Sequence, residues 1–257
     1  ILEKDLNLIK SKKFKKFKKI QSIFFNSVGG VSKNIYKSLN CGIGSSDKKR
    51  NVLKNLKIVY KKAGIKKNSL VINKQVHSNK IYFIDKIPST KLIGDGLITN
   101  VKGLALGILT ADCAPIFFYD PINNIIGAAH AGWRGAFKKI INKMVLNFLK
   151  MGSKIKNLYV VIGPCISQNN YEVKKNFKNL FLRQNRNNIK YFKLKNNKIF
   201  FDLGGYILGQ LKFLKIKNVE MIKKDTFDNK NKFFSARRSF KRKVYDYGRN
   251  ISIIMIK

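Results

Sequence analysis

Ten short apolar runs constrain the fold of this 257-residue chain more than any other feature. Many of them are rich in β-branched or aromatic residues and are bounded by turn residues, which is the pattern of β-strands. The runs are QSIFFNS (21–27), SLVINKQ (69–75), KIYFID (80–85), GLALGIL (103–109), PIFFYD (115–120), NNIIGAA (123–129), NLYVVIG (157–163), KIFFD (198–202), VEMIKK (219–224) and ISIIMIK (251–257).

Fewer segments have helical periodicity. The clearest is residues 135–151, where apolar side chains from Phe137 to Leu149 follow the i, i+3, i+4, i+7 rule before Gly152 ends the pattern. Further helices are predicted over 52–62, 173–182 and 203–214. Strands outnumber helices by about two to one and do not alternate strictly with them, which argues against a doubly wound sheet. We therefore predict an α+β fold.

Length and composition predict one domain over residues 1–257, with a basic N-terminal segment at 1–20 and no linker that would divide the chain. No apolar run approaches the ~20 residues that a membrane span needs. The N-terminal residues lack the apolar region of a signal peptide, and three widely spaced cysteines do not form a disulfide framework. A cytoplasmic protein without a membrane partner is expected.

The formal net charge of +41 would ordinarily indicate nucleic-acid binding. The basic residues are spread along the whole chain, and 46 of the 54 are Lys, accompanied by abundant Asn and Ile. AT-rich codons produce this mixture, so we interpret the charge as mostly incidental and expect no specific nucleic-acid partner. A basic RNA-binding protein on an inactive enzyme fold remains an alternative.

One local concentration of charge stands out, at Ser11–Ile20, where Phe14, Phe17 and Ile20 recur every third residue among six lysines. The pattern fits a basic amphipathic arm for RNA or an anionic membrane. It equally fits a segment that its aromatic residues hold on the core, and we favour that interpretation.

The chain contains two histidines, His77 and His130, and Cys113 lies between them in the sequence. Each of the three stands where an apolar run gives way to Gly, Pro or polar residues, so strand ends could bring them together. Two imidazoles and a thiolate form a three-ligand zinc set with an open fourth position, as in catalytic sites. The alternative is that both histidines are hydrogen-bonded core residues and Cys113 is a small buried hydrophobic residue.

Several motifs resemble those of the YfiH-like laccase-domain family, also called multicopper polyphenol oxidases and now regarded as purine nucleoside phosphorylases. The resemblance covers about residues 20–257. It rests on GGVSKNIYKSLNCG (29–42), QVH (75–77), GDGLIT (94–99), TADC followed by Pro (110–115), AAHAGWRG (128–135), GPCI with YEV (163–173), and FFSARR followed by YGRN near the end.

The resemblance implies layered mixed sheets flanked by helices, and zinc bound by His77, Cys113 and His130. Four positions depart from the family pattern. Ser78 follows QVH in place of Gly, and Cys41 and Ala236 replace Leu and Tyr. Leu56 stands where the family has an Arg that contributes to the substrate pocket, which predicts altered substrate affinity or specificity.

Arginines near these motifs are candidates for phosphate binding. Arg134 lies in a glycine-rich turn beside His130, where the N–H groups that open the predicted helix would form an anion site. Arg237 and Arg238 belong to the FFSARR motif and are further candidates. Trp133, the only tryptophan, could stack on a purine, although we expect it to fill the core.

Two aspartates complete the predicted site. Asp112 precedes Cys113 and is a candidate catalytic residue, and Asp95 of GDGLIT is a candidate for binding substrate or orienting a ligand histidine. Either could instead cap a turn. The predicted chemistry is displacement of the base by phosphate at the ribose carbon, or of the adenine amino group by water. The resemblance implies both activities, with adenosine, inosine and S-methyl-5'-thioadenosine as substrates.

The number of histidines and cysteines limits the copper chemistry that this chain could support. One blue-copper centre would already use both histidines and a cysteine, so true multicopper oxidase activity is rejected, although copper could substitute for zinc. A cysteine or metal hydrolase that edits peptidoglycan precursors, with Cys113 as nucleophile, remains an alternative.

The expected partners are a nucleoside and phosphate, and a monomer is expected.

Overall fold

The computed structural model describes residues 8–66 and 68–257, and the fold within these ranges is α+β as predicted. The strands are β1 (Leu8–Ile9), β2 (Ile20–Phe25), β3 (Leu70–Ile72), β4 (Ile81–Phe83), β5 (Gly96–Thr99), β6 (Ala105–Thr110), β7 (Ala114–Asp120), β8 (Ile125–Ala131), β9 (Tyr159–Ile162), β10 (Glu172–Val173), β11 (Phe192–Lys195), β12 (Lys198–Phe201), β13 (Asn218–Met221) and β14 (Asn250–Ile256). The helices are α1 (Lys12–Lys15), α2 (Lys49–Lys62), α3 (Trp133–Phe137), α4 (Ile140–Lys150), α5 (Lys175–Gln184), α6 (Leu203–Phe213) and α7 (Ala236–Lys241). Each of the ten strand-like runs contains a strand.

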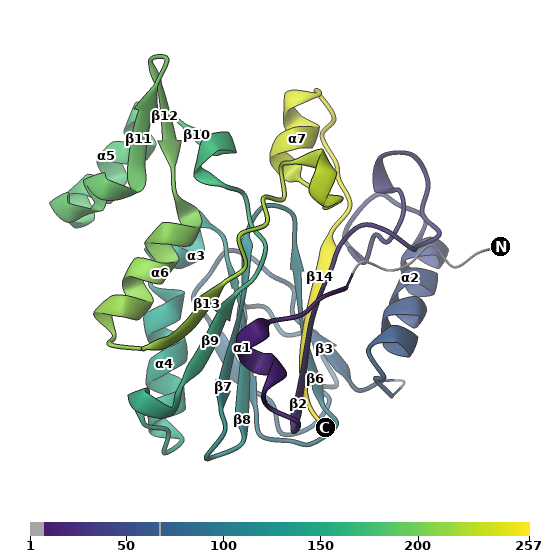
Figure 1. The fold of residues 1–257 in the computed structure, drawn as a ribbon. Helices are drawn as coiled ribbons and strands as arrows, with labels where there is room; N and C mark the ends of the chain where they lie inside the picture. Colours follow the sequence, from purple (N-terminus) through teal and green to yellow (C-terminus); the bar gives the residue numbers. More distant parts are fainter. Residues whose placement is uncertain (1–7, 67) are drawn as a thin grey trace.

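Two large mixed sheets pack face to face in the centre of the molecule (Figure 1). One has the order β1-β2-β14-β6-β3 and the other β13-β9-β7-β8-β5-β4. Only their edge pairs β3/β6, β4/β5 and β13/β9 are parallel. Between the sheets Phe24 stacks on Phe117, with ring centroids 4.8 Å apart, and the surrounding side chains are apolar and buried.

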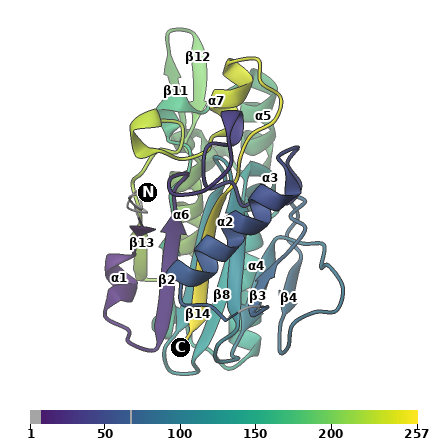
Figure 2. The ribbon, with the colours of Figure 1, turned by 90° about the vertical axis from the view of Figure 1, so that its right-hand side faces the viewer.

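Helices cover the outer faces of both sheets, so the molecule is layered as helix, sheet, sheet, helix (Figures 1 and 2). α2 buries Val52, Leu56 and Val59 against the five-stranded sheet. α4 and α6 lie on the six-stranded sheet, where a Cβ on Gly127 would stand 2.6 Å from Met144 Cε. Glycine at that position therefore allows α4 to approach the sheet closely.

The predicted single helix over 135–151 is wrong, because the segment forms two helices, α3 and α4. Lys139 adopts a left-handed conformation with φ 58°, which ends α3 and turns the chain before α4 begins. Phe137 on the first helix and Ile140 on the second still pack into the same core cluster, so the apolar periodicity continues across the break.

A small sheet, β10-β12-β11, and α5 stand at one end of the molecule (Figure 1). Phe177, Phe181 and Phe201 form an aromatic cluster there, with ring centroids 4.8–5.2 Å apart. Trp133 joins this cluster through an edge contact with Phe177 at 5.0 Å. Trp133 is half-buried and packs against the core cluster, in line with the expected structural role.

Aromatic side chains hold the basic N-terminal segment on the body of the protein, as favoured above. Phe14 is 3% exposed, and Phe17 makes edge contacts with Tyr119 and Tyr159 at 5.1 and 4.8 Å. Glu220 accepts hydrogen bonds from the Ser11 hydroxyl and from the first backbone N–H groups of α1.

Residues 1–7 of the predicted segment lie outside the described residues. Among the described residues, no helix has the length and apolar character that crossing a bilayer requires.

Candidate metal centre and its pocket

His77, Cys113 and His130 meet at one end of the six-stranded sheet. His77 lies in the loop between β3 and β4, Cys113 directly precedes β7, and His130 is the penultimate residue of β8. β7 and β8 are antiparallel neighbours with Ala114 opposite Ala131, so this register places the start of β7 beside the end of β8. Strand pairing thus brings Cys113 and His130 together although the sequence separates them.

The ligand atoms of these three residues all lie within 4.8 Å of one another. Cys113 Sγ is 3.8 Å from His77 Nε2, and the two imidazole rings are 4.8 Å apart at 75°. A Cβ on Gly132 would stand 2.7 Å from Cys113 Sγ and 2.8 Å from the His77 ring, so only glycine leaves room for them. Two nitrogens and one sulfur at this spacing fit a tetrahedral zinc site with one position open.

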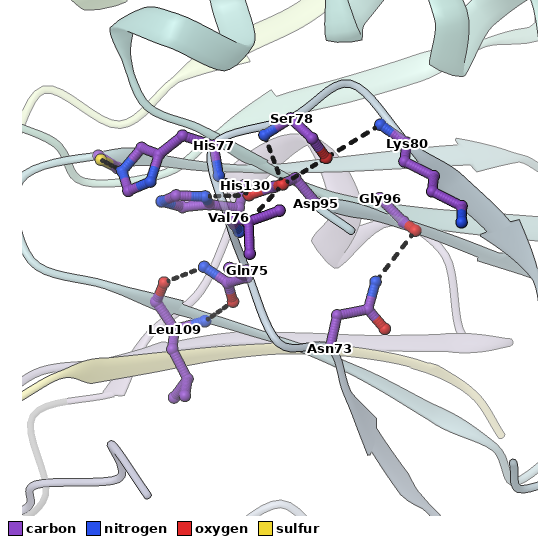
Figure 3. A network of polar contacts seen from close by, with 11 residues as sticks. Asn73, Gln75, Val76, His77, Ser78, Lys80, Asp95, Gly96, Leu109 and His130 are labelled. Carbon is purple, nitrogen blue, oxygen red and sulfur yellow. Dashed lines mark hydrogen bonds and ion pairs between the residues drawn. The ribbon is translucent and has the colours of Figure 1, made fainter. Parts of the chain in front are cut away.

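Asp95 is fully buried behind the histidines and holds both in place (Figure 3). Its carboxylate accepts hydrogen bonds from His130 Nδ1 at 2.8 Å, from the His77 backbone N–H at 3.0 Å and from the backbone and hydroxyl of Ser78, both at 2.7 Å. Burial alone would raise the pKa of Asp95, but the bonds from His130 and Ser78 outweigh it and lower the pKa to about 2. Asp95 remains an anion that fixes the ring of His130, as partners of metal-binding histidines do.

Gln75 of the QVH motif fixes the loop that carries His77. Its amide exchanges two hydrogen bonds with the backbone of Leu109 on β6, at 2.7 and 2.8 Å (Figure 3). The loop needs this support because His77 itself has a left-handed backbone with φ 58°, which is uncommon outside glycine.

The electrostatics favour the ligand form of Cys113. Burial would raise the pKa of its thiol, but the neighbouring imidazoles of His130 and His77 outweigh this effect and lower the pKa to about 6. Metals bind the thiolate, so the site is prepared for coordination near neutral pH. Cys41 and Cys165 are also free thiols, and burial raises the pKa of each.

A pocket of about 410 Å³ opens beside His77 and Cys113. Its volume lies in the range of small-molecule sites. Its lining includes Asp112, Tyr171, Arg237, Phe240, Lys241 and Tyr247. Tyr171 and Tyr247 belong to the family motifs YEV and YGRN, whereas Phe240 and Lys241 lie outside every motif and were not predicted. Helical spacing in ARRSFK was the available signal, because Ala236, Arg237, Phe240 and Lys241 stand at i, i+1, i+4 and i+5.

Asp112 connects the candidate metal centre to α7. Its carboxylate accepts hydrogen bonds from Thr226 Oγ1 at 2.7 Å, Ser235 Oγ at 2.9 Å and the Arg237 backbone N–H at 2.6 Å. Burial raises the pKa of Asp112, against the opposing effect of these hydrogen bonds. Asp112 is 8% exposed, and its oxygens are engaged by the start of α7 directly beside Cys113.

The three candidate arginines occupy different environments. Arg237 lines the pocket, donates from Nη1 to Glu172 O at 2.9 Å and lies 5.2 Å above the ring of Tyr171. Arg238 donates to three backbone carbonyls, those of Thr226, Phe227 and Phe233, and so holds the preceding loop. Arg134 is exposed, stacks on its neighbour Trp133 at 4.8 Å and lies outside the residues that line the pocket.

The Asn55-Leu56 pair has a structural role in α2. Asn55 Nδ2 donates to Ser32 Oγ and to the carbonyls of Ser38 and Asn40. Leu56 is 5% exposed and packs into the apolar cluster beneath the helix. The family has a pocket-lining Arg at position 56, but neither Asn55 nor Leu56 is among the residues that line the pocket beside Cys113.

Fold and site together define a class of protein in which two histidines and a cysteine that could hold a metal ion lie at the end of two stacked mixed sheets. Comparison with known proteins agrees with the resemblance. The model of the family described as multi-copper polyphenol oxidoreductase laccase matches residues 21–257, and the chain belongs to this family.

Individual relatives match most of the chain. A purine nucleoside phosphorylase of Rickettsia prowazekii is 37% identical over 194 residues, which are 75% of this chain and 80% of the relative. The crystal structure of the hypothetical protein YfiH from Bacillus licheniformis has a TM-score of 0.88 at 28% identity and covers 95% of both chains. YlmD from Geobacillus stearothermophilus has a TM-score of 0.86 at 25% identity, covering 96% of this chain and 94% of its own.

Proposed function

We propose that this protein is a zinc-dependent purine nucleoside phosphorylase that acts on adenosine, inosine and S-methyl-5'-thioadenosine and also deaminates adenosine. The observation that carries the proposal is the convergence of His77, Cys113 and His130 beside a pocket of nucleoside size. The relative from Rickettsia prowazekii, named a purine nucleoside phosphorylase, supports the same activity.

His77, Cys113 and His130 would hold the metal. Because His130 Nδ1 bonds to the Asp95 carboxylate, that nitrogen carries the proton and Nε2 is left for coordination. Bound zinc would act as a Lewis acid, and copper could bind to the same three side chains.

Arg237 is the residue that we assign to phosphate. Arg237 lines the pocket, and its guanidinium donates from Nη1 to Glu172 O, which leaves other N–H groups for an anion. In phosphorolysis an oxygen of phosphate forms a bond to ribose C1′, the bond from C1′ to the base nitrogen breaks, and its electron pair leaves with the base. Arg237 would hold the attacking anion in line for that displacement.

We assign positioning roles to the two aspartates. Asp95 orients His130 and the His77 loop, and Asp112 anchors the first turn of α7, which carries Arg237. Their oxygens are already satisfied by protein donors, so direct contact with substrate is assigned to neither. Arg238 supports the loop before α7, and Arg134 lies outside the pocket.

The test is incubation of metal-analysed protein with adenosine, with and without phosphate, followed by identification of the products. Phosphate-dependent formation of adenine and ribose 1-phosphate is expected, with inosine as the product of deamination. Cys113→Ala should abolish both reactions, whereas Cys165→Ala should retain them as a matched thiol control. Absence of turnover by the zinc-loaded protein would refute the proposal.

A further inference from the structure

α7 presents one continuous face to the pocket. Ala236, Arg237, Phe240 and Lys241 all line it, and α7 stands at the end of the sheets where β14 begins (Figure 1). Phe240 is 49% exposed although it belongs to this lining. A large apolar ring that stays half exposed at a pocket wall has surface free for a ligand.

Tyr247 holds the ring of Phe240 from the side. The two rings are 5.6 Å apart at 87°, so the edge of one ring meets the face of the other. Tyr247 is itself fixed by Arg249, whose guanidinium lies 4.9 Å above its ring and donates to the Tyr247 carbonyl at 3.0 Å. Phe240 and Tyr247 therefore form a supported corner of two perpendicular rings, which we call the aromatic corner.

The other residues that line the pocket differ in their chemistry. Cys113 and His77 belong to the metal centre, and Arg237 provides a cation one turn before Phe240 on the same helix. Ala236 adds only a methyl group at the start of α7. Ile166, Leu203 and Tyr171 also line the pocket, but the guanidinium of Arg237 lies over the Tyr171 ring. The half-exposed ring of Phe240 makes the aromatic corner suited to a flat, weakly polar group.

We propose that the aromatic corner is the subsite for the purine base, with the base stacked on the ring of Phe240. The inference rests on the proposed function and adds the orientation of the substrate, with the base at Phe240 and the phosphate at Arg237. Aromatic side chains stack on any base because every base has a π-face. Asp112 connects this arrangement to the metal centre, because it anchors α7 beside Cys113.

Binding of adenine to the metal-loaded protein, measured by equilibrium dialysis, tests the subsite without requiring turnover. F240A and F240L should bind adenine about tenfold more weakly, because they remove the aromatic face on which the base stacks. F240W should bind within about twofold of the parent, because it restores the aromatic face. Phe213→Ala is the matched control, since that side chain is 83% exposed on α6 and outside the pocket lining.

Equal adenine affinity in F240A and the parent protein, or no adenine binding by the parent, would overturn the inference. Steady-state kinetics give a second readout. F240A should raise KM for adenosine and leave KM for phosphate unchanged, whereas an equal rise in both would show a general structural role and reject the subsite. Adenine binding that depends on Phe240 in a protein without turnover would refute the proposed function and still support the subsite.

Discussion

The carboxylate of Asp95 lies 2.8 Å from Nδ1 of His130. It also accepts the backbone N–H of His77, so one buried anion positions two of the three proposed metal ligands. Such partners of ligand histidines fix the ring orientation and raise the basicity of the coordinating nitrogen.

Asp95→Asn should therefore weaken zinc affinity by about 10–100-fold while the fold is retained. The amide keeps the shape of the carboxylate but removes its charge and one acceptor. Zinc affinity, measured by competition with a chelator, checks this expectation. Asp85→Asn serves as control because Asp85 is exposed. Unchanged zinc affinity in the Asp95 variant would contradict the assigned role.

Arg237→Ala should raise KM for phosphate about tenfold or more, because a charge-assisted hydrogen bond contributes ~1.5–3 kcal/mol. Zinc content should not change, since no ligand is removed. Arg134→Ala should have a smaller effect, because Arg134 is exposed and lies outside the pocket lining. Arg183→Ala, an exposed arginine of α5, is the neutral comparison. A phosphate defect confined to Arg134→Ala would reverse the assignment.

Asp246 predicts a pH dependence of stability. Burial alone would raise its pKa, but hydrogen bonds from the Ser46 backbone N–H and the Tyr36 hydroxyl outweigh it and lower the pKa below its ordinary value. Because the folded-state pKa is lower than the unfolded value of ~3.9, this contribution is complete above that pH and disappears as pH falls through the folded-state pKa.

Asp246→Asn should thus lower the thermal unfolding midpoint at neutral pH, and its difference from the parent should shrink below pH ~3.9. Thermal unfolding followed by circular dichroism over this range is the measurement. A difference between variant and parent that stays constant across the range would show that the charge of Asp246 makes no contribution.

The net charge of +41 should lead to loose, non-specific contacts with nucleic acid. We expect no tight complex of defined site size at physiological salt, because the basic residues are distributed along the whole chain. Filter binding with RNAs of several sequences, at ~50 and ~200 mM salt, checks this. Tight binding of one sequence with a defined site size would favour the RNA-binding alternative.

The sequence predicted strands well because burial produces a local signal. Each of the ten runs from QSIFFNS to ISIIMIK holds a strand, and each metal-ligand candidate stands at or near the end of a run. The break at Lys139 carried no such signal, since neither Gly nor Pro marks it. Phe137 before it and Ile140 after it pack into the same core cluster, so the apolar pattern continues across the break.

Roles set by distant contacts were harder to predict. The hydrogen bond between Asp112 and Ser235 joins residues 123 positions apart, so the contact of this candidate catalytic carboxylate with the start of α7 had no local signal. The roles of the two neighbouring arginines also depend on contacts distant in the sequence. Arg237 and Arg238 are adjacent in the sequence, yet one lines the pocket and the other binds backbone carbonyls.

The most direct test of the central claim is titration of metal-free protein with zinc while phosphate-dependent release of adenine from adenosine is followed. We expect activity to rise with zinc until one equivalent per chain is bound, and to be absent at every zinc level in Cys113→Ala. Full activity of the metal-free protein, or of Cys113→Ala, would contradict the account.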